Sequence, residues 1–86
     1  MSIEIRKPTP EEEAEMKAWP TWSKEPSEFP WYYNDKETCL VLEGEVTVET
    51  DAETVSFGPG DCVVFPQGLE CTWKISKAVK KHYKFG

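Results

Sequence analysis

Hydrophobic and polar residues alternate along most of the chain after residue 37, which is the pattern of β-strands with one buried face. The alternation is clear in residues 38–50, TCLVLEGEVTVET, where it predicts two strands joined by a turn at the Glu-Gly-Glu of residues 43–45. Further short strands are predicted at residues 54–57, 62–65, 71–75 and 79–85. This succession predicts an all-β fold and excludes a helical one.

Glycine and proline residues separate these strands. Turns are predicted at residues 51–52, at the Gly-Pro-Gly-Asp of residues 58–61 and at the Pro-Gln-Gly of residues 66–68. Short strands at this spacing, joined by glycine-rich turns, are typical of β-sandwiches and β-barrels. We therefore expect one of these two architectures.

The chain before residue 19 predicts a short strand at residues 2–6 and then a helix. Thr9 and Glu12 have the spacing of a capping box, and Pro10 suits the first helical position. Pro20 disfavours helical backbone at the residue before it, so we expect a helix of about two turns.

Residues 19–31, WPTWSKEPSEFPW, contain three prolines and three tryptophans. Proline removes backbone donors and tryptophan anchors a chain by burial, so the segment is expected to be extended. Its aromatic side chains could form a cage for a ligand, or they could cover the outside of a sheet or contact another subunit.

The length of 86 residues corresponds to one domain, residues 1–86. Within it we assign residues 1–30 to the N-terminal strand, helix and extended segment, and residues 31–86 to the core of the barrel. A core that depends on few, large aromatic side chains leaves apolar surface to cover, so we also expect a homodimer.

The net charge of −6 argues against a nucleic-acid partner, because phosphate groups would be repelled. Residues 74–86 nevertheless contain five lysines and no acidic residue. These lysines could bind an anionic ligand or partner, or they could form the solvated face of a last strand.

The three cysteines, Cys39, Cys62 and Cys71, show no C-x-x-C spacing, so neither a disulfide framework nor a zinc ribbon is predicted. No apolar run approaches the ~20 residues of a membrane span, and the first residues lack the basic-then-apolar pattern of a secretory leader. We expect a cytoplasmic protein without a membrane partner. A removed organelle-targeting segment remains an open alternative.

Two spaced motifs occur in the strand region. Glu37 is followed seven residues later by a glycine, and residues 60–71 show the spacing G-x5-P-x-G-x2-C. In this order the two motifs resemble those of the cupin superfamily. The aromatic residues at 19–22, 31–33, 65–73 and 81–85 make the chain similar to small single-domain cupins of the (S)-ureidoglycine aminohydrolase cupin-domain type. The resemblance implies a double-stranded β-helix, or jelly-roll barrel, with one short N-terminal helix, and often a dimer.

Metal-binding cupins offer histidines before this glutamate and in the second motif. Here the corresponding positions fall on Trp31 and Tyr33, or on their neighbours, and on Cys71, so only Glu37 is unchanged. Indole nitrogen has no lone pair to offer, and transition metals need three or four protein ligands. His82, the single histidine, would add one ligand at most. We therefore expect no cofactor, and a divalent metal is disfavoured.

Alternation places Glu37 and Cys39 on one strand face, and Cys71 and Trp73 on one face of another strand. With Tyr33, these side chains would line the mouth of a barrel. Few polar groups among apolar walls are typical of a small-molecule site. The predicted ligand-binding residues are Trp31, Tyr33, Cys39, Cys71, Trp73 and His82.

Glu37 is the candidate general acid or base. Burial would raise the pKa of its carboxyl group, and a hydrogen bond from Tyr33 would lower it. The alternative is a structural carboxylate held by amides of a neighbouring loop. Cys71 is a candidate nucleophile only if His82 lies close enough to act as its base.

Three functions are consistent with these observations. The first is a metal-independent cupin that binds a small organic molecule, with acid–base chemistry at Glu37 as a possible extension. The second is a non-catalytic dimeric scaffold or partner-binding module. The third is a metal-dependent, amidohydrolase-like enzyme, which the missing histidines argue against.

Overall fold

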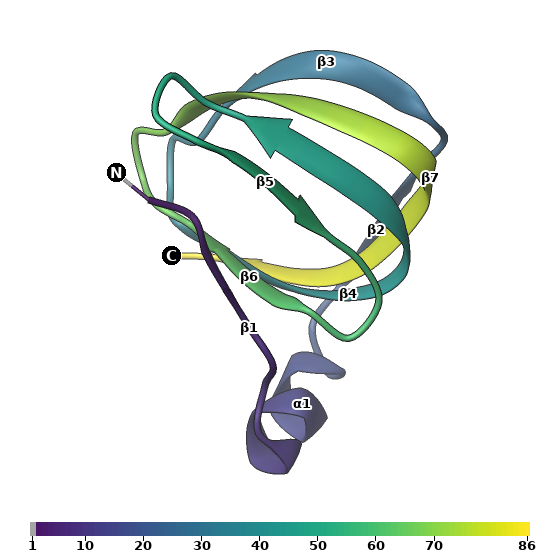
Figure 1. Ribbon diagram of the computed structural model, residues 1–86. Helices are drawn as coiled ribbons and strands as arrows, with labels where there is room; N and C mark the ends of the chain where they lie inside the picture. Colours follow the sequence, from purple (N-terminus) through teal and green to yellow (C-terminus); the bar gives the residue numbers. More distant parts are fainter. Residues whose placement is uncertain (1) are drawn as a thin grey trace.

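The computed structural model describes residues 2–86. Its strands curve into a barrel, and a short helix lies outside one end of it (Figure 1). The elements are β1 (Glu4–Arg6), α1 (Pro10–Met16), β2 (Thr21–Lys24), β3 (Ser27–Tyr32), β4 (Glu37–Glu49), β5 (Thr54–Phe57), β6 (Cys62–Phe65) and β7 (Glu70–Phe85). Within the described residues, no helix has the length and apolar character needed to cross a membrane.

The long strands β4 and β7 form the centre of the sheet. They pair antiparallel from Glu37 opposite Phe85 to Glu49 opposite Thr72. On the far side of β4, β6 pairs with the first part of the strand and β5 with the last part, while β1 extends the sheet beyond β6. On the far side of β7 lie β2 and β3. The predicted all-β jelly-roll barrel with one short helix is confirmed.

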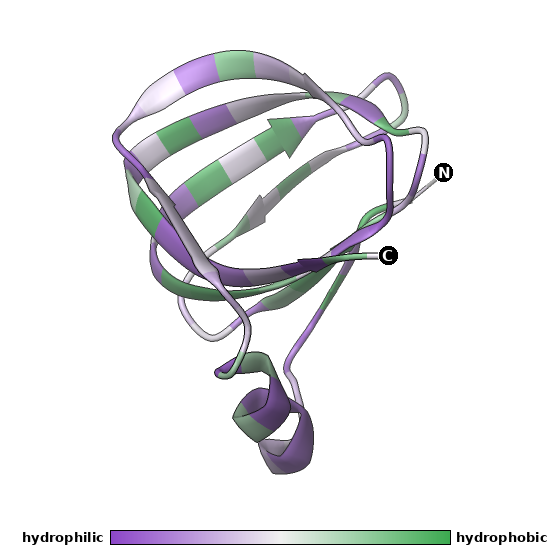
Figure 2. Cartoon of the chain, turned by 180° about the vertical axis from the view of Figure 1, so that it is seen from behind, coloured by the Kyte–Doolittle hydropathy of each residue, from purple (hydrophilic) through white to green (hydrophobic). Residues whose placement is uncertain are grey.

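Alternation along the strands separates the barrel interior from its outer surface, and hydrophobic and hydrophilic bands alternate along the strands in Figure 2. The interior holds one large buried cluster that includes Cys39 of β4 and both Cys71 and Trp73 of β7. The predicted grouping of these three side chains is therefore correct.

The turn predicted at residues 43–45 is wrong, because β4 continues through it as a bent strand. Register shifts between Val41 and Val46 mark the bend. Gly44 has φ +103°, and a Cβ atom there would lie 2.5 Å from the Ala78 carbonyl oxygen. The glycine therefore allows two backbones to approach at a barrel corner, which is the role of glycine in a strand bulge.

The two strands predicted at residues 71–75 and 79–85 are likewise one strand, β7. The intervening residues 76–78 are exposed and lie opposite the bend of β4. The break in the alternation between the two predicted strands therefore reflects exposure at the corner of the barrel. The predicted turns at residues 51–52, 58–61 and 66–68 do separate strands and are confirmed.

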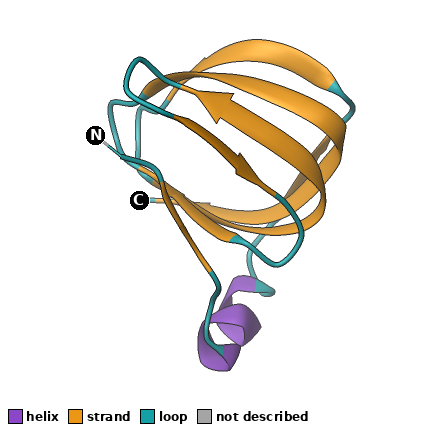
Figure 3. Ribbon diagram, viewed as in Figure 1, coloured by secondary structure: helices purple, strands orange, loops and turns teal. Residues whose placement is uncertain are grey.

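Helix α1 begins and ends as predicted, and Figure 3 shows it joined by loops to β1 and β2. The Thr9 hydroxyl accepts a hydrogen bond from the Glu12 amide at 3.2 Å, and the Glu12 carboxylate accepts one from the Thr9 amide at 3.0 Å. At its last turn Met16 packs against Leu40 and Cys62 on the outer face of the sheet. The helix covers a second, smaller apolar cluster there.

The proline- and tryptophan-rich segment is extended as predicted, but it is part of the sheet and not an outer cover. Its strands β2 and β3 both pair with β7, so the barrel sheet begins before residue 31. Pro30 is compatible with β3 because this strand pairs on one side only, and proline occurs in sheets mainly on such edge strands. Trp22 and Phe29 pack against the interior cluster.

Candidate functional site

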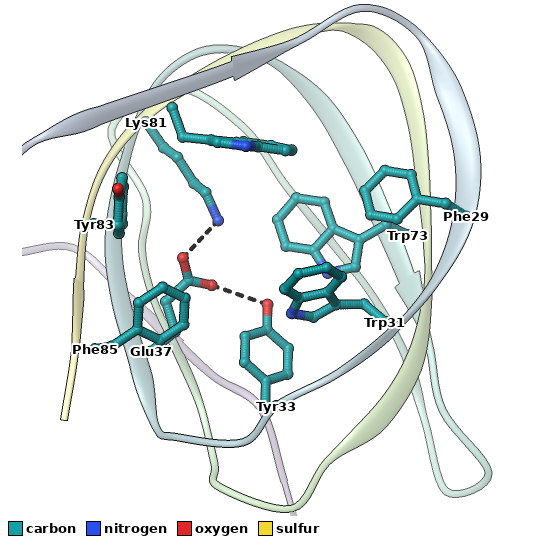
Figure 4. Close-up of a pocket in the computed structure, with 9 residues that line it drawn as sticks. Phe29, Trp31, Tyr33, Glu37, Trp73, Lys81, Tyr83 and Phe85 are labelled. Carbon is teal, nitrogen blue, oxygen red and sulfur yellow. Dashed lines mark hydrogen bonds and ion pairs between the residues drawn. The ribbon is translucent and has the colours of Figure 1, made fainter.

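The barrel contains a cavity of about 220 Å³ with mostly aromatic walls (Figure 4). It lies between the inward faces of β2, β3, β4 and β7. Alternation along β3 and β7 turns every second side chain toward it. The lining residues are Trp22, Phe29, Trp31, Tyr33, Glu37, Trp73, Lys81, Tyr83 and Phe85.

Three polar side chains form a connected group on one side of the cavity. The Tyr33 hydroxyl donates a hydrogen bond to Glu37 Oε1 at 2.9 Å. The Lys81 ammonium donates one to Glu37 Oε2 at 2.7 Å. Only 3% of Glu37 and 5% of Lys81 are exposed, so this ion pair is almost completely removed from bulk water.

Aromatic rings stabilise the positive charge of Lys81. Its Nζ atom lies 4.6 Å from the ring centre of Trp73 and 5.0 Å from that of Trp22. A cation over an indole face is attracted by the ring quadrupole, and the attraction grows when both are shielded from water. The carboxylate and the two indoles together compensate for the burial of the ammonium group.

Tyr33 is held as a neutral hydrogen-bond donor. Burial raises the pKa of its hydroxyl group well above the ordinary value, and the negative charge of Glu37 raises it further. Its ring stacks on Phe65 with centroids 4.8 Å apart and an 8° interplanar angle. The donor that we expected for Glu37 is thus present and fixed in orientation.

The alternative role of Glu37, as a carboxylate bound by loop amides, is not what the structure shows. Within residues 2–86 its hydrogen-bond partners are the side chains of Tyr33 and Lys81. The carboxylate therefore forms part of the cavity wall.

Four of the predicted site residues line the cavity, namely Trp31, Tyr33, Glu37 and Trp73. The cysteines do not. Cys39 is fully buried in the interior cluster, and Cys71 directs its sulfur toward the Trp31 carbonyl oxygen at 3.6 Å. The prediction that two thiols form part of the pocket wall is therefore wrong, because both are covered by neighbouring side chains.

His82 is also absent from the cavity. It pairs with Leu40 across the sheet and faces outward, with Nδ1 2.9 Å from the Trp19 carbonyl oxygen. Its position next to Lys81 on β7 reverses its direction. The hypothetical pair of Cys71 and His82 is consequently not formed, and burial raises the pKa of the Cys71 thiol to about 11.

Sequence reasoning missed five lining residues: Trp22, Phe29, Lys81, Tyr83 and Phe85. Lys81 matters most. For the five lysines of residues 74–86 the sequence predicted either an anionic ligand or partner or a solvated strand face, and not a buried ion pair with Glu37. A usable signal existed in the period-two spacing from Trp73 through residues 79, 81, 83 and 85. Treating the region as two strands interrupted that count.

The donor chemistry of this site does not fit a divalent metal. Within the described residues, no three His, Cys, Asp or Glu side chains gather closely enough to hold one. Trp31 offers an N–H donor, Tyr33 is a neutral phenol, and the carboxylate of Glu37 is already paired with an ammonium group. Lys81 supplies the positive charge beside Glu37.

Comparison with known protein families decides the family. The family model of the EutQ-like cupin domain matches residues 11–83. This chain belongs to the EutQ-like cupin domain family. Membership of the cupin superfamily is thus confirmed, whereas the narrower resemblance to ureidoglycine aminohydrolase cupin domains remains a prediction. Among curated proteins, the comparison finds no match.

Solved structures of this EutQ-like cupin's relatives support the assignment. A DUF861 family protein from Thermotoga maritima is 46% identical, covers 99% of this chain and 100% of its own, and has a TM-score of 0.93. The Clostridium difficile EutQ protein is 20% identical, with 76% and 52% of the two chains covered and a TM-score of 0.70. A putative ethanolamine utilization protein Q from Salmonella typhimurium is 22% identical, with 99% and 69% covered and a TM-score of 0.69. At these identities, the last two proteins show that they share the fold of this chain.

Proposed function

We propose that this EutQ-like cupin binds a small planar organic molecule in its aromatic cavity. The observation that carries the proposal is the Tyr33–Glu37–Lys81 group, which faces a cavity otherwise walled by apolar rings. Few convergent polar groups among aromatic walls are the usual composition of a small-molecule site. Trp31 and Phe85, about half exposed, give the cavity an edge in contact with solvent.

The cavity volume limits the size of the ligand. At ~30 Å³ for each water molecule, about 220 Å³ corresponds to about seven waters. A ligand of roughly seven to ten non-hydrogen atoms would occupy that space. A single aromatic ring with one substituent is of this size, and its flat faces can stack on the walls.

Acid–base chemistry at Glu37 is the catalytic form of this proposal. The carboxylate can accept a proton from a bound molecule, and the adjacent Lys81 ammonium can stabilise negative charge that develops on it. Metal-dependent, amidohydrolase-like chemistry is not proposed, since the donor set does not fit a metal. Kinship with the (S)-ureidoglycine aminohydrolase cupin domains is proposed only at the level of fold and ancestry.

The tryptophans provide a direct test of binding. Trp22, Trp31 and Trp73 line the cavity, whereas Trp19 packs against the separate cluster beneath α1. In 15N-labelled protein each indole N–H gives its own NMR signal. Titration with phenol, indole or 2-pyridone should shift the signals of the three cavity tryptophans and leave Trp19 unchanged. Absence of any such shift at millimolar probe would overturn the proposal, as would equal shifts of all four signals.

A second candidate function is partner binding, including homodimer formation. It is favoured by three exposed aromatic side chains, Trp31 (48%), Tyr32 (50%) and Phe85 (47%). Tyr32 does not line the cavity. The substitution Tyr32→Ser should therefore lower the solution mass measured by light scattering if this surface joins two copies, while the NMR response to planar probes stays intact. An unchanged mass would remove this surface from consideration.

A further inference from the structure

We infer that the cavity selects neutral, flat molecules that present a hydrogen-bond acceptor next to an N–H donor on one edge, as a lactam ring does. The inference rests on the proposed function and names the chemistry of its ligand. It follows from the arrangement of the Glu37–Lys81 pair, from the net charge of that pair and from the ring walls opposite it (Figure 4).

The pair offers a donor and an acceptor side by side. An ammonium group has three N–H donors, and within residues 2–86 Glu37 is the hydrogen-bond partner of Lys81. A carboxylate has about four acceptor positions, of which Tyr33 and Lys81 each use one. The unused donors and acceptors lie on neighbouring atoms only 2.7 Å apart. A ligand edge with a carbonyl oxygen beside an N–H group can satisfy both at once.

The charges of the site favour a neutral ligand. Glu37 and Lys81 are both almost fully buried, and their charges cancel. An anion or a cation would bring an uncompensated charge into a place shielded from water, which is unfavourable. A neutral group with strong dipoles avoids that cost and still meets an ionised donor and an ionised acceptor, whose hydrogen bonds are the stronger ones.

The walls favour a conjugated ring. Trp73 stacks with Phe29 at a 15° interplanar angle and meets Trp22 edge to face, so flat ring surfaces border the cavity in more than one direction. A lactam within an aromatic ring, such as 2-pyridone, is planar and has seven non-hydrogen atoms, which matches the cavity volume. Its polar edge can face Glu37 and Lys81 while its ring contacts the indoles.

A matched pair of probes tests the inference. 2-Pyridone carries the adjacent acceptor and donor, whereas N-methyl-2-pyridone keeps the ring and the carbonyl but loses the donor. Dissociation constants come from NMR titration of the tryptophan indole signals. We expect 2-pyridone to bind at least about tenfold more tightly, because the methylated ring leaves the carboxylate without its partner. In the double variant Glu37→Gln/Lys81→Met the preference should shrink to about twofold or less.

A second comparison needs no variant and stands even if the double variant fails to fold. Neutral benzamide should bind the wild-type protein at least about tenfold more tightly than anionic benzoate or cationic benzylamine. Equal affinities within both probe sets would overturn the inference but leave the proposed function intact. If none of these probes shifts the cavity tryptophans, the inference and the proposed function fall together.

Discussion

The Lys81 ammonium nitrogen lies 2.7 Å from a carboxylate oxygen of Glu37, and both side chains are withdrawn from water inside the barrel. The sequence resembles the first cupin motif at Glu37, and that resemblance predicted a site residue there. The positive charge beside it belongs to a side chain 44 residues further along the chain. Four testable consequences concern this pair and the strands that hold it.

Removal of the carboxylate should destabilise the protein strongly. Glu37→Gln leaves the buried Lys81 ammonium without a counter-charge, and breaking a buried pair from one side costs about 3–5 kcal/mol. The measurement is the free energy of unfolding from urea titration. The matched control is Glu45→Gln, on the same strand, which breaks the exposed ion pair with Lys77 and should change stability little. Equal effects of the two variants would show that burial does not matter here.

The Tyr33 hydroxyl should stabilise the ionised carboxylate. Tyr33→Phe removes the hydrogen bond to Glu37 but keeps the ring stacked on Phe65. We expect a loss of about 1.5–3 kcal/mol, the usual contribution of a hydrogen bond to a charged group. Tyr32→Phe, at the neighbouring exposed position, is the control and should leave the urea midpoint unchanged. An unchanged free energy of unfolding in Tyr33→Phe would show that the hydrogen bond to Glu37 does not stabilise the folded protein.

Gly44 should tolerate no side chain. Gly44→Ala combines a left-handed backbone conformation with a Cβ atom 2.5 Å from the Ala78 carbonyl oxygen, so we expect a loss of more than about 3 kcal/mol. Gly60→Ala separates the two causes. It shares a positive φ of +87° but meets only the Lys7 ammonium nitrogen at 3.5 Å, so about 1–2 kcal/mol is expected. Thermal unfolding followed by circular dichroism measures both, and similar losses would refute the close approach at the corner.

Stability should fall at alkaline pH because of buried thiols. Burial raises the pKa of Cys39 to about 12 and that of Cys71 to about 11. A raised folded-state pKa keeps the proton on in the native state, whereas thiols of the unfolded chain ionise near pH ~8.5. The unfolded state then binds fewer protons, so the stabilisation is complete below that pH and is lost as pH rises toward the folded-state values.

The slope of stability against pH tests this assignment. Urea unfolding between about pH 8 and about pH 9.5 avoids the ordinary range of tyrosine ionisation. Cys39→Ala should lower stability at every pH but flatten the decline by up to about 1.4 kcal/mol per pH unit. A decline as steep as in the wild type would show that other groups release the protons.

Local patterns were sufficient to predict where β-structure lies after residue 37, the cap of α1 and the turns between β4, β5, β6 and β7. These features depend on nearest-neighbour chemistry, such as the Thr9–Glu12 box. The course of the chain at Gly44 could not be predicted in that way. A glycine between alternating strands is compatible with a turn or with a bulge, and the choice depends on Ala78, which lies far away in the sequence.

The site residues show the same difference between local and long-range information. Glu37 and Trp73 were identified by alternation in short runs, and Trp31 and Tyr33 by the resemblance to the first cupin motif. Lys81 was missed because its place in the interior depends on β7 being unbroken over sixteen residues. His82 was wrongly predicted as a site residue because an imidazole can act as a base or a ligand. Whether a strand residue faces inward depends on its odd or even position along the strand, and His82 follows the inward-facing Lys81.

The ion pair has a consequence for how the site is supplied. Its positive charge is tethered to the backbone, so each newly folded copy carries it at a fixed stoichiometry of one. The positive charge beside Glu37 is therefore set in place by the pairing of β4 with β7.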